Sequence, residues 1–270
     1  MRDLAARHAI RPSKSLGQNF LVDPNLARAI AAEANVGPGD RVVEIGAGLG
    51  SLTVALAASG AEVLAVEFDR AIVPALMEVA AGDPGIRVVP ADAMRLDWTE
   101  LLGEGTWAMA SNLPYNIAVP LVLEMLERAP GVGRYVVMVQ REVGERLAAG
   151  PGDEAYGAVS VRVAYRAAAR VVRRVPPAVF WPAPKVASVV VRLDRLDAPP
   201  VDADPGRLWA VVDAGFAERR KTMRNAVRRL GLTAEEADDA LRAAGIDPQT
   251  RAESLGLPDF ARLAGTIDRA

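Results

Sequence analysis

Short apolar runs rich in β-branched residues alternate with longer helix-like stretches through the first half of the chain, and this alternation constrains the fold most strongly. Strands buried on both faces of a parallel sheet have this near-continuous apolar character, and helices connect them. The chain is therefore predicted to form an α/β fold with a doubly wound, mostly parallel sheet. The runs are residues 41–45, 62–66, 86–89, 107–110 and 135–139.

The pattern changes twice in the second half of the chain. Residues 169–175 and 188–193 flank a proline-rich loop at 176–184, which predicts an antiparallel hairpin at the edge of the sheet. Beyond residue 198 apolar residues recur at helical spacing, Thr233 and Glu236 form a capping box, and Gly245 ends a helix. We expect one domain at residues 1–198 and a small all-α C-terminal domain at 199–270.

The composition excludes several kinds of chemistry. The 270 residues include no cysteine and one histidine, His8, so disulfides, thiolate nucleophiles and a zinc site are not expected, and no metal is predicted. No apolar run approaches the roughly 18 residues of a membrane span, and the first residues carry charges where a signal peptide is apolar. We expect a cytoplasmic enzyme that makes no contact with a membrane.

A glycine-rich segment follows the first apolar run. Gly46, Gly48 and Gly50 would let the backbone turn sharply between a strand and a helix and let a ligand approach closely. A dinucleotide-binding loop requires G-x-G-x-x-G, but here the third glycine comes one position early and Ser51 occupies its place. The loop thus favours a ligand without a pyrophosphate.

Carboxylates follow the next two runs. Glu67 comes some 20 residues after the glycine loop, where a carboxylate accepts hydrogen bonds from both ribose hydroxyls, and Asp92 is placed to accept one from an adenine amine. The carboxyl ends of parallel strands meet at one edge of a sheet. We therefore predict that this edge binds an adenosine-containing cofactor.

A polar and aromatic tetrad, Asn112-Leu113-Pro114-Tyr115, follows the fourth run. The Asn112 amide oxygen and the Pro114 backbone carbonyl are two acceptors, and Tyr115 offers an aromatic face for a flat ring. Two acceptors beside an aromatic face suit the exocyclic amine of a nucleobase.

These motifs, and others along its whole length, resemble those of small-subunit (16S) rRNA adenine dimethyltransferases of the KsgA/RsmA family. One departure is Ala252, where many members have proline. The resemblance implies a Rossmann-like class I methyltransferase fold and S-adenosylmethionine as cofactor. The matching segments are residues 15–21, 42–53, 112–117, 140–143, 156–157, 180–186 with Ser188, and 216–225.

The resemblance also assigns roles to residues. It implies that the first domain binds S-adenosylmethionine, with help from its N-terminal segment, and that Phe180 and Tyr115 sandwich the target adenine. The predicted cofactor-binding residues are Gln18, Asn19, Leu21, Gly46, Gly48, Glu67, Asp92, Ala93 and Asn112. The predicted catalytic residues are Asn112, Leu113, Pro114, Tyr115 and Phe180.

A basic segment marks the predicted helical domain as the part that docks on RNA. Within a chain of net charge -2, six cations crowd residues 219–229 with only Glu218 opposing them in that segment, which indicates a phosphate-binding surface. A second basic series, Arg162, Arg166, Arg170, Arg173 and Arg174, leads toward the Phe180 loop. The predicted RNA-binding residues are Arg219, Arg220, Lys221, Arg224 and Arg228.

The expected reaction is dimethylation of the N6 amines of two adjacent adenines near the 3′ end of small-subunit rRNA, late in subunit assembly. The expected partners are the small ribosomal subunit and its rRNA, and the protein is expected to be monomeric. Two alternatives stay open: a large-subunit rRNA adenine methylase of the macrolide-resistance type, against which the basic segment argues, and a ribosome-assembly factor that mainly binds. A DNA adenine methylase is disfavoured because Asn112 and Leu113 differ from its usual tetrads.

Overall fold

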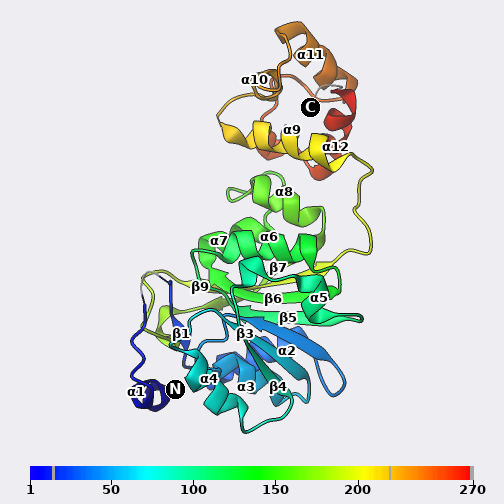
Figure 1. Cartoon of the computed structure of the whole chain (residues 1–270). Coiled ribbons are helices and arrows are strands. Elements are labelled where there is room, and N and C mark those ends of the chain that lie inside the picture. Colours follow the sequence, from blue (N-terminus) through cyan, green and yellow to red (C-terminus); the bar gives the residue numbers. More distant parts are fainter. Residues whose placement is uncertain (14–15, 219, 268–270) are drawn as a thin grey trace. The chain divides into compact units, whose positions relative to one another are not determined.

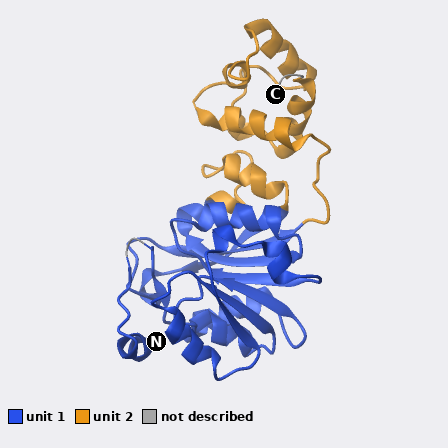
Figure 2. Ribbon diagram, viewed as in Figure 1, with its two compact units in different colours: residues 1–145, 167–195 blue, residues 146–166, 196–270 orange. Residues whose placement is uncertain are grey.

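The structure is a computed structural model that describes residues 1–13, 16–218 and 220–267. The chain divides into two compact units (Figure 2). The sheet unit comprises residues 1–145 and 167–195, and the helical unit comprises residues 146–166 and 196–270. In the described part of the chain, no helix is long and apolar enough to cross a membrane.

A seven-stranded sheet forms the centre of the sheet unit (Figure 1). Its strand order is β4-β3-β2-β5-β6-β9-β7, in which β4 to β6 are parallel and β9 runs antiparallel to both β6 and β7. The predicted parallel sheet and its antiparallel edge hairpin are confirmed. The strands are β2 (Arg41–Ile45), β3 (Glu62–Glu67), β4 (Ile86–Pro90), β5 (Trp107–Asn112), β6 (Val132–Gln140), β7 (Ala167–Val175) and β9 (Ser188–Arg195).

Helices cover both faces of this sheet. On one face α2, α3 and α4 pack against strand residues such as Val42, Val63 and Ala65. On the other, the Tyr135 hydroxyl donates to Met125 of α6, and Gly144 of α7 packs so tightly on Val189 and Val191 that no Cβ would fit. The helices of this unit are α1 (Arg2–Arg7), α2 (Pro24–Ala34), α3 (Ser51–Ala57), α4 (Val73–Ala80), α5 (Trp98–Leu102), α6 (Ala118–Arg128), α7 (Arg141–Ala148, which ends in the helical unit) and the short η1 (Ala93–Arg95) and η2 (Pro177–Val179).

A second, two-stranded sheet ties the N-terminal segment to the proline-rich loop, and the sequence pattern did not predict it. In this sheet β1 (Phe20–Leu21) pairs antiparallel with β8 (Phe180–Trp181). The rings of Phe20 and Trp181 lie 6.0 Å apart between centroids. The pairing holds the N-terminal segment beside the carboxyl edge of the large sheet.

The helical unit has its own apolar core, which includes Tyr156, Leu208, Met223 and Phe260. The predicted capping box of Thr233 and Glu236 is confirmed at the start of α11, and Gly245 follows its end with φ 74°. The elements of this unit are α8 (Ala158–Ala164), α9 (Pro205–Ala217), α10 (Met223–Arg228), α11 (Ala234–Ala243), η3 (Ala252–Ser254) and α12 (Leu257–Thr266).

The compact units differ from the predicted domains at residues 146–166, which the sequence pattern grouped with the sheet. Tyr156, Val161 and Tyr165 bury their side chains in the helical core, and the Tyr156 hydroxyl donates to the Leu255 carbonyl at 2.8 Å. Residues 1–198 and 199–270 as separate functional domains stay a prediction.

Candidate active site

A cavity of about 310 Å³ opens at the carboxyl edge of the parallel strands. Ligand sites of α/β sheets are found at this edge, and the volume is in the range typical of small-molecule sites. The lining brings together residues from five segments far apart in the sequence. They are residues 16–21, 44–52, 66–72, 91–94 and 112–117, with positions 50, 70 and 71 not among them.

The glycine loop connects β2 to α3 with Gly46, Gly48 and Gly50 all at positive φ. Glycine is required for close approach as well as for conformation: a Cβ on Gly46 would lie 3.3 Å from the Pro114 ring, and one on Gly48 would lie 3.1 Å from the Phe20 ring. The loop therefore packs directly against the tetrad and the N-terminal segment.

Glu67 ends β3 inside the cavity and is 6% exposed. One carboxylate oxygen accepts from the Gly48 amide and the other from the Asp69 amide, both at 2.8 Å. Burial raises the pKa of this carboxyl group, and hydrogen bonds from the backbone of Asp69, Gly48 and Phe68 oppose the shift. Since each oxygen has a second lone pair, Glu67 can still accept hydrogen bonds from two ligand hydroxyls.

A second carboxyl group, Glu44 of β2, lies beneath the loop and is 1% exposed. The hydroxyl of Thr53 donates a hydrogen bond to this carboxyl group at 2.5 Å. Burial raises the pKa of Glu44 to about 8, and the nearby charge of Glu67 acts in the same direction. Glu44 is therefore a neutral acid near pH 7, and Glu67 is the carboxylate that faces the ligand.

Asp92 follows β4, and one of its carboxylate oxygens caps the short helix η1 by accepting from the Met94 amide at 3.0 Å. The other oxygen lies 3.4 Å from Arg95, whose side chain is 86% exposed. Ala93 is the first residue of η1, so its amide has no acceptor within that helix. The carboxylate and this amide together offer an acceptor and a donor to a purine edge.

The N-terminal segment closes one side of the cavity through three hydrogen bonds, one from a side chain and two to backbone carbonyls. Gln18 donates to Asp69 at 2.7 Å, the Asn19 backbone carbonyl accepts from Asn112, and the Leu21 carbonyl accepts from the Ser51 hydroxyl. Each bond joins the segment to the end of a sheet strand or to the loop that follows one. The predicted cofactor-binding residues thus lie around one cavity.

The tetrad continues β5 into the cavity. The Asn112 side-chain nitrogen donates to the Asn19 carbonyl at 3.0 Å, and no described residue donates to its amide oxygen. The Pro114 carbonyl accepts from the Ile117 amide at 3.2 Å and retains one lone pair. Leu113 is 2% exposed and serves as the apolar anchor of the tetrad.

Tyr115 lines the cavity, and its hydroxyl lies 2.7 Å from the Ser188 hydroxyl at the start of β9. Burial raises the pKa of Tyr115, which keeps the phenol neutral. Phe180, the predicted second half of the sandwich, is 3% exposed and packs in the apolar core under α2 and α3. It does not line the cavity, so its stacking role stays a prediction that requires its side chain to turn outward.

Three residues of the site had no predicted role. Ser188 orients Tyr115, Asp69 holds Gln18, and Phe68 is an exposed aromatic side chain, 59% accessible, in the cavity wall. The position of Phe68 directly after Glu67 is the one sequence signal among them, since an exposed aromatic beside a ligand carboxylate is suited to an adenine ring.

The basic segment of the helical unit surrounds the start of α10. Some of its cations form ion pairs with carboxylates. Arg224 pairs with Asp238 at 2.8 Å, and Arg229 pairs with Glu218. The opposing carboxylate at Asp238 was not predicted. Arg220, Lys221 and Arg228 are exposed and have no ion-pair partner within the described residues, while Arg219 lies outside them.

Comparisons with known proteins identify the family of the chain. The model of the ribosomal RNA adenine dimethylase family matches residues 10–269. Ribosomal RNA small subunit methyltransferase A of Thermobifida fusca is 49% identical over 269 residues, which cover 98% of this chain and 93% of that protein. The protein of the same name from Moorella thermoacetica is 44% identical over 274 residues, with 98% and 95% covered.

Solved structures share the fold. A dimethyladenosine transferase from Plasmodium falciparum superposes with a TM-score of 0.78 at 24% identity and covers 90% of this chain and 95% of its own. The 23S rRNA methyltransferase ErmE superposes with a TM-score of 0.72, also at 24% identity, over 93% and 100%. These likenesses confirm the predicted Rossmann-like class I methyltransferase fold.

Proposed function

The chain belongs to the ribosomal RNA adenine dimethylase family, and we propose that it dimethylates the N6 amines of two adjacent adenines near the 3′ end of small-subunit rRNA. It is an S-adenosylmethionine-dependent rRNA adenine dimethyltransferase. The observation that carries the chemistry is the juxtaposition of Asn112, Pro114 and Tyr115 with the Glu67 carboxylate around one cavity.

The residues of the cavity fit the cofactor. The Glu67 carboxylate is held by two backbone amides and can accept from both ribose hydroxyls, while Asp92 and the Ala93 amide can pair with the adenine edge. Phe68 offers an apolar face to that ring. When bound, the cofactor supplies a methyl group on a positively charged sulfur.

The target amine is a poor nucleophile because its lone pair is delocalised into the adenine ring. The side-chain nitrogen of Asn112 donates a hydrogen bond to the Asn19 carbonyl. The amide oxygen of Asn112 is therefore the end that meets the substrate. Together with the Pro114 carbonyl it can accept both amine hydrogens and turn the nitrogen lone pair toward the methyl group.

No general base is needed at this site. The exocyclic nitrogen becomes acidic once it is alkylated, so water can remove the proton. The same two acceptors must then readmit a monomethylated amine that has one hydrogen left. The pocket therefore binds the monomethylated adenine for a second transfer, and dimethyladenosine is the expected end product.

Tyr115 positions the base. Its ring can stack on the flipped adenine, and stacking of this kind contributes roughly 1–3 kcal/mol per base. The Ser188 hydroxyl fixes the orientation of the phenol at 2.7 Å. Since the adenine must leave its stack to reach Tyr115, an unpaired rRNA position is the expected target.

The partner is rRNA, and we propose that the protein recognises it within the small ribosomal subunit at a late stage of assembly. The unpaired charges of Arg220, Lys221 and Arg228 in the helical unit support docking on phosphates, with Arg224 and Arg219 as further candidates. We further propose that the protein acts as a monomer in the cytoplasm. A role in binding the immature subunit is compatible with the same surface.

The test is methyl transfer from labelled cofactor to unmethylated small subunits, large subunits and naked rRNA, followed by nucleoside analysis. The proposal predicts dimethyladenosine in the small-subunit reaction at two adjacent positions. Transfer confined to large subunits would instead identify a macrolide-resistance type of methylase. Binding to immature small subunits without any transfer would leave only an assembly factor.

A further inference from the structure

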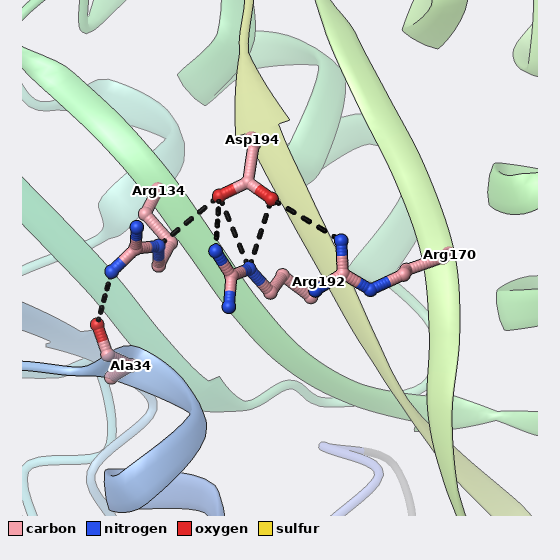
Figure 3. Close-up of polar contacts among 5 residues, drawn as sticks. All are labelled: Ala34, Arg134, Arg170, Arg192 and Asp194. Carbon is pink, nitrogen blue, oxygen red and sulfur yellow. Dashed lines mark hydrogen bonds and ion pairs between the residues drawn. The ribbon is translucent and has the colours of Figure 1, made fainter.

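The edge of the sheet farthest from β4 carries arginines that the cofactor cavity does not use. Arg134 of β6, Arg170 of β7 and Arg192 of β9 surround one carboxylate, Asp194 (Figure 3). Their nearest nitrogens lie 3.1 Å, 3.6 Å and 2.9 Å from its oxygens. Three guanidinium groups against one carboxylate leave two positive charges in excess.

Asp194 orders these side chains to different degrees. Desolvation acts to raise its pKa, but hydrogen bonds from Arg192 and Arg134 outweigh it and lower the pKa. Arg134 also donates to the Ala34 carbonyl at the end of α2, so it is committed to the fold (Figure 3). Arg170 is 59% exposed, and among the described residues its one ion pair is the 3.6 Å contact with Asp194, so its guanidinium can reach a further anion.

A β-bulge adds a fourth arginine to this face. Arg170 pairs with Arg192 and Arg173 pairs with Val190, because the register shifts between Val171 and Arg173. Positions two apart on β9 share a face of the sheet, so the shift places Arg173 on the same face as Arg170. Arg173 is exposed and has no ion-pair partner among the described residues.

This row of arginines leads to the catalytic tetrad. On β9 the same face continues from Arg192 through Val190 to Ser188, whose hydroxyl contacts Tyr115. Arg173 lies two residues before Val175, which pairs with Ser188, and this is about 7 Å along the strand. A strand of RNA whose base enters the tetrad would pass its neighbouring phosphates along such a row.

We propose that the arginine face, defined as Arg134, Arg170, Arg173 and Arg192, binds the rRNA backbone next to the target adenine. This inference rests on the proposed function. Charges and a bulge on an edge strand also prevent sheets from pairing with one another, but that role requires no alignment of the charges on one face. The opposite edge strand β4 has one arginine, Arg87, and the chain as a whole is net negative.

The test compares the double variant Arg170→Gln/Arg173→Gln with the wild type in binding to purified unmethylated small subunits over a range of salt. Each lost phosphate contact reduces the log-log salt slope by about 0.7 and at 0.15 M salt weakens binding about fourfold. The double variant should therefore bind about fifteenfold more weakly and have a slope smaller by about 1.4. The KM for subunits should rise while kcat stays unchanged, because these residues do not touch the amine.

Two single variants control for loss of charge alone. Arg87→Gln removes an arginine from the opposite edge strand, and Arg174→Gln removes one from β7 at a position that pairs with Val189 and so lies on the other face. Both should bind like the wild type. Arg173→Gln alone should give about half of the change in slope, and it removes no ion pair that joins two described residues.

Three outcomes separate the possibilities. An unchanged affinity and slope in the double variant, with a wild-type enzyme that methylates small subunits, would overturn the arginine face and leave the proposed function intact. Equal losses in Arg87→Gln and Arg173→Gln would also overturn it, because the effect would then be one of net charge. A wild-type enzyme that transfers no methyl group to small subunits would refute the proposed function itself.

Discussion

The buried acid Glu44 gives a prediction about stability that can be worked out from the structure. Its pKa rises from 4.5 to about 8 because the side chain is fully buried. A group with a raised pKa in the folded state contributes its full stability only at pH values where it is protonated in both the folded and the unfolded protein. That stability is lost as the pH rises from 4.5 through about 8, because only the unfolded chain can ionise freely.

Glu44→Gln removes this dependence, since glutamine matches the neutral acid in shape and can still accept from Thr53. Each pH unit in the interval costs the wild type about 1.4 kcal/mol, so the variant should gain about 4 kcal/mol over it between pH 5 and pH 8. Urea unfolding at several pH values measures the difference. Glu62→Gln on β3 removes an exposed carboxylate and controls for net charge.

A difference between Glu44→Gln and the wild type that does not change with pH would refute the reasoning. It would mean that Glu44 ionises in the folded protein with its ordinary pKa, and that burial does not keep it neutral. The assignment of a neutral Glu44 beside the Glu67 carboxylate would then lose its electrostatic basis.

The remaining predictions concern binding and the base. Glu67→Ala should weaken S-adenosylmethionine binding by roughly 1–3 kcal/mol. The loss should exceed that in Asp92→Ala, since Glu67 is buried and also accepts from the Gly48 amide. Calorimetry that finds the affinity of both variants unchanged would reject the site. Tyr115→Ala should leave cofactor affinity unchanged and reduce methyl transfer by about 1–3 kcal/mol of lost stacking, whereas a loss of cofactor binding would place Tyr115 against the cofactor. The double variant Arg220→Glu/Lys221→Glu should weaken subunit binding and flatten its salt dependence by at least about 0.7 per lost contact, without changing the unfolding midpoint; an unaltered slope would show that this surface is only solvated.

The sequence was informative about the fold because its strands and their ends are local features. The apolar runs coincide with β2 to β6, and Glu67, Asp92 and Asn112 end or follow strands that the parallel register brings to one edge. The helical spacing and the capping box of α11 were equally local. Each of these features depends on residues within about one turn or one strand of each other.

The parts that could not be predicted depend on contacts between distant residues. The β1–β8 pair joins residues about 160 apart in sequence, and Ser188 meets Tyr115 only because β9 folds back beside β6. The burial of Phe180 follows from the pairing of β1 with β8. Periodicity along the chain contains no information about which loop covers which strand, so the proline-rich segment was predicted as a loop and β8 within it was not.

The ion pairs of the basic segment illustrate the same limit at the level of charge. Arg224 and Asp238 are separated by a loop and a helical turn, and the helix packing that joins them is not visible in the sequence. Counting cations along the segment identified Glu218 as an opposing charge but could not find Asp238. The structure separates Arg220 and Lys221, which have no ion-pair partner among the described residues, from Arg224, which has one.

The central claim is that the Asn112 amide oxygen acts on the target amine, and a single-turnover measurement tests it most directly. Asn112→Ala in excess over unmethylated small subunits is mixed with saturating S-adenosylmethionine, and the transferred label is followed in time while cofactor affinity is measured separately. Loss of one preorganised acceptor should slow transfer on the order of a hundredfold to a thousandfold even with both ligands bound. A rate near that of the wild type under saturation would contradict the claim and move the chemistry away from the tetrad.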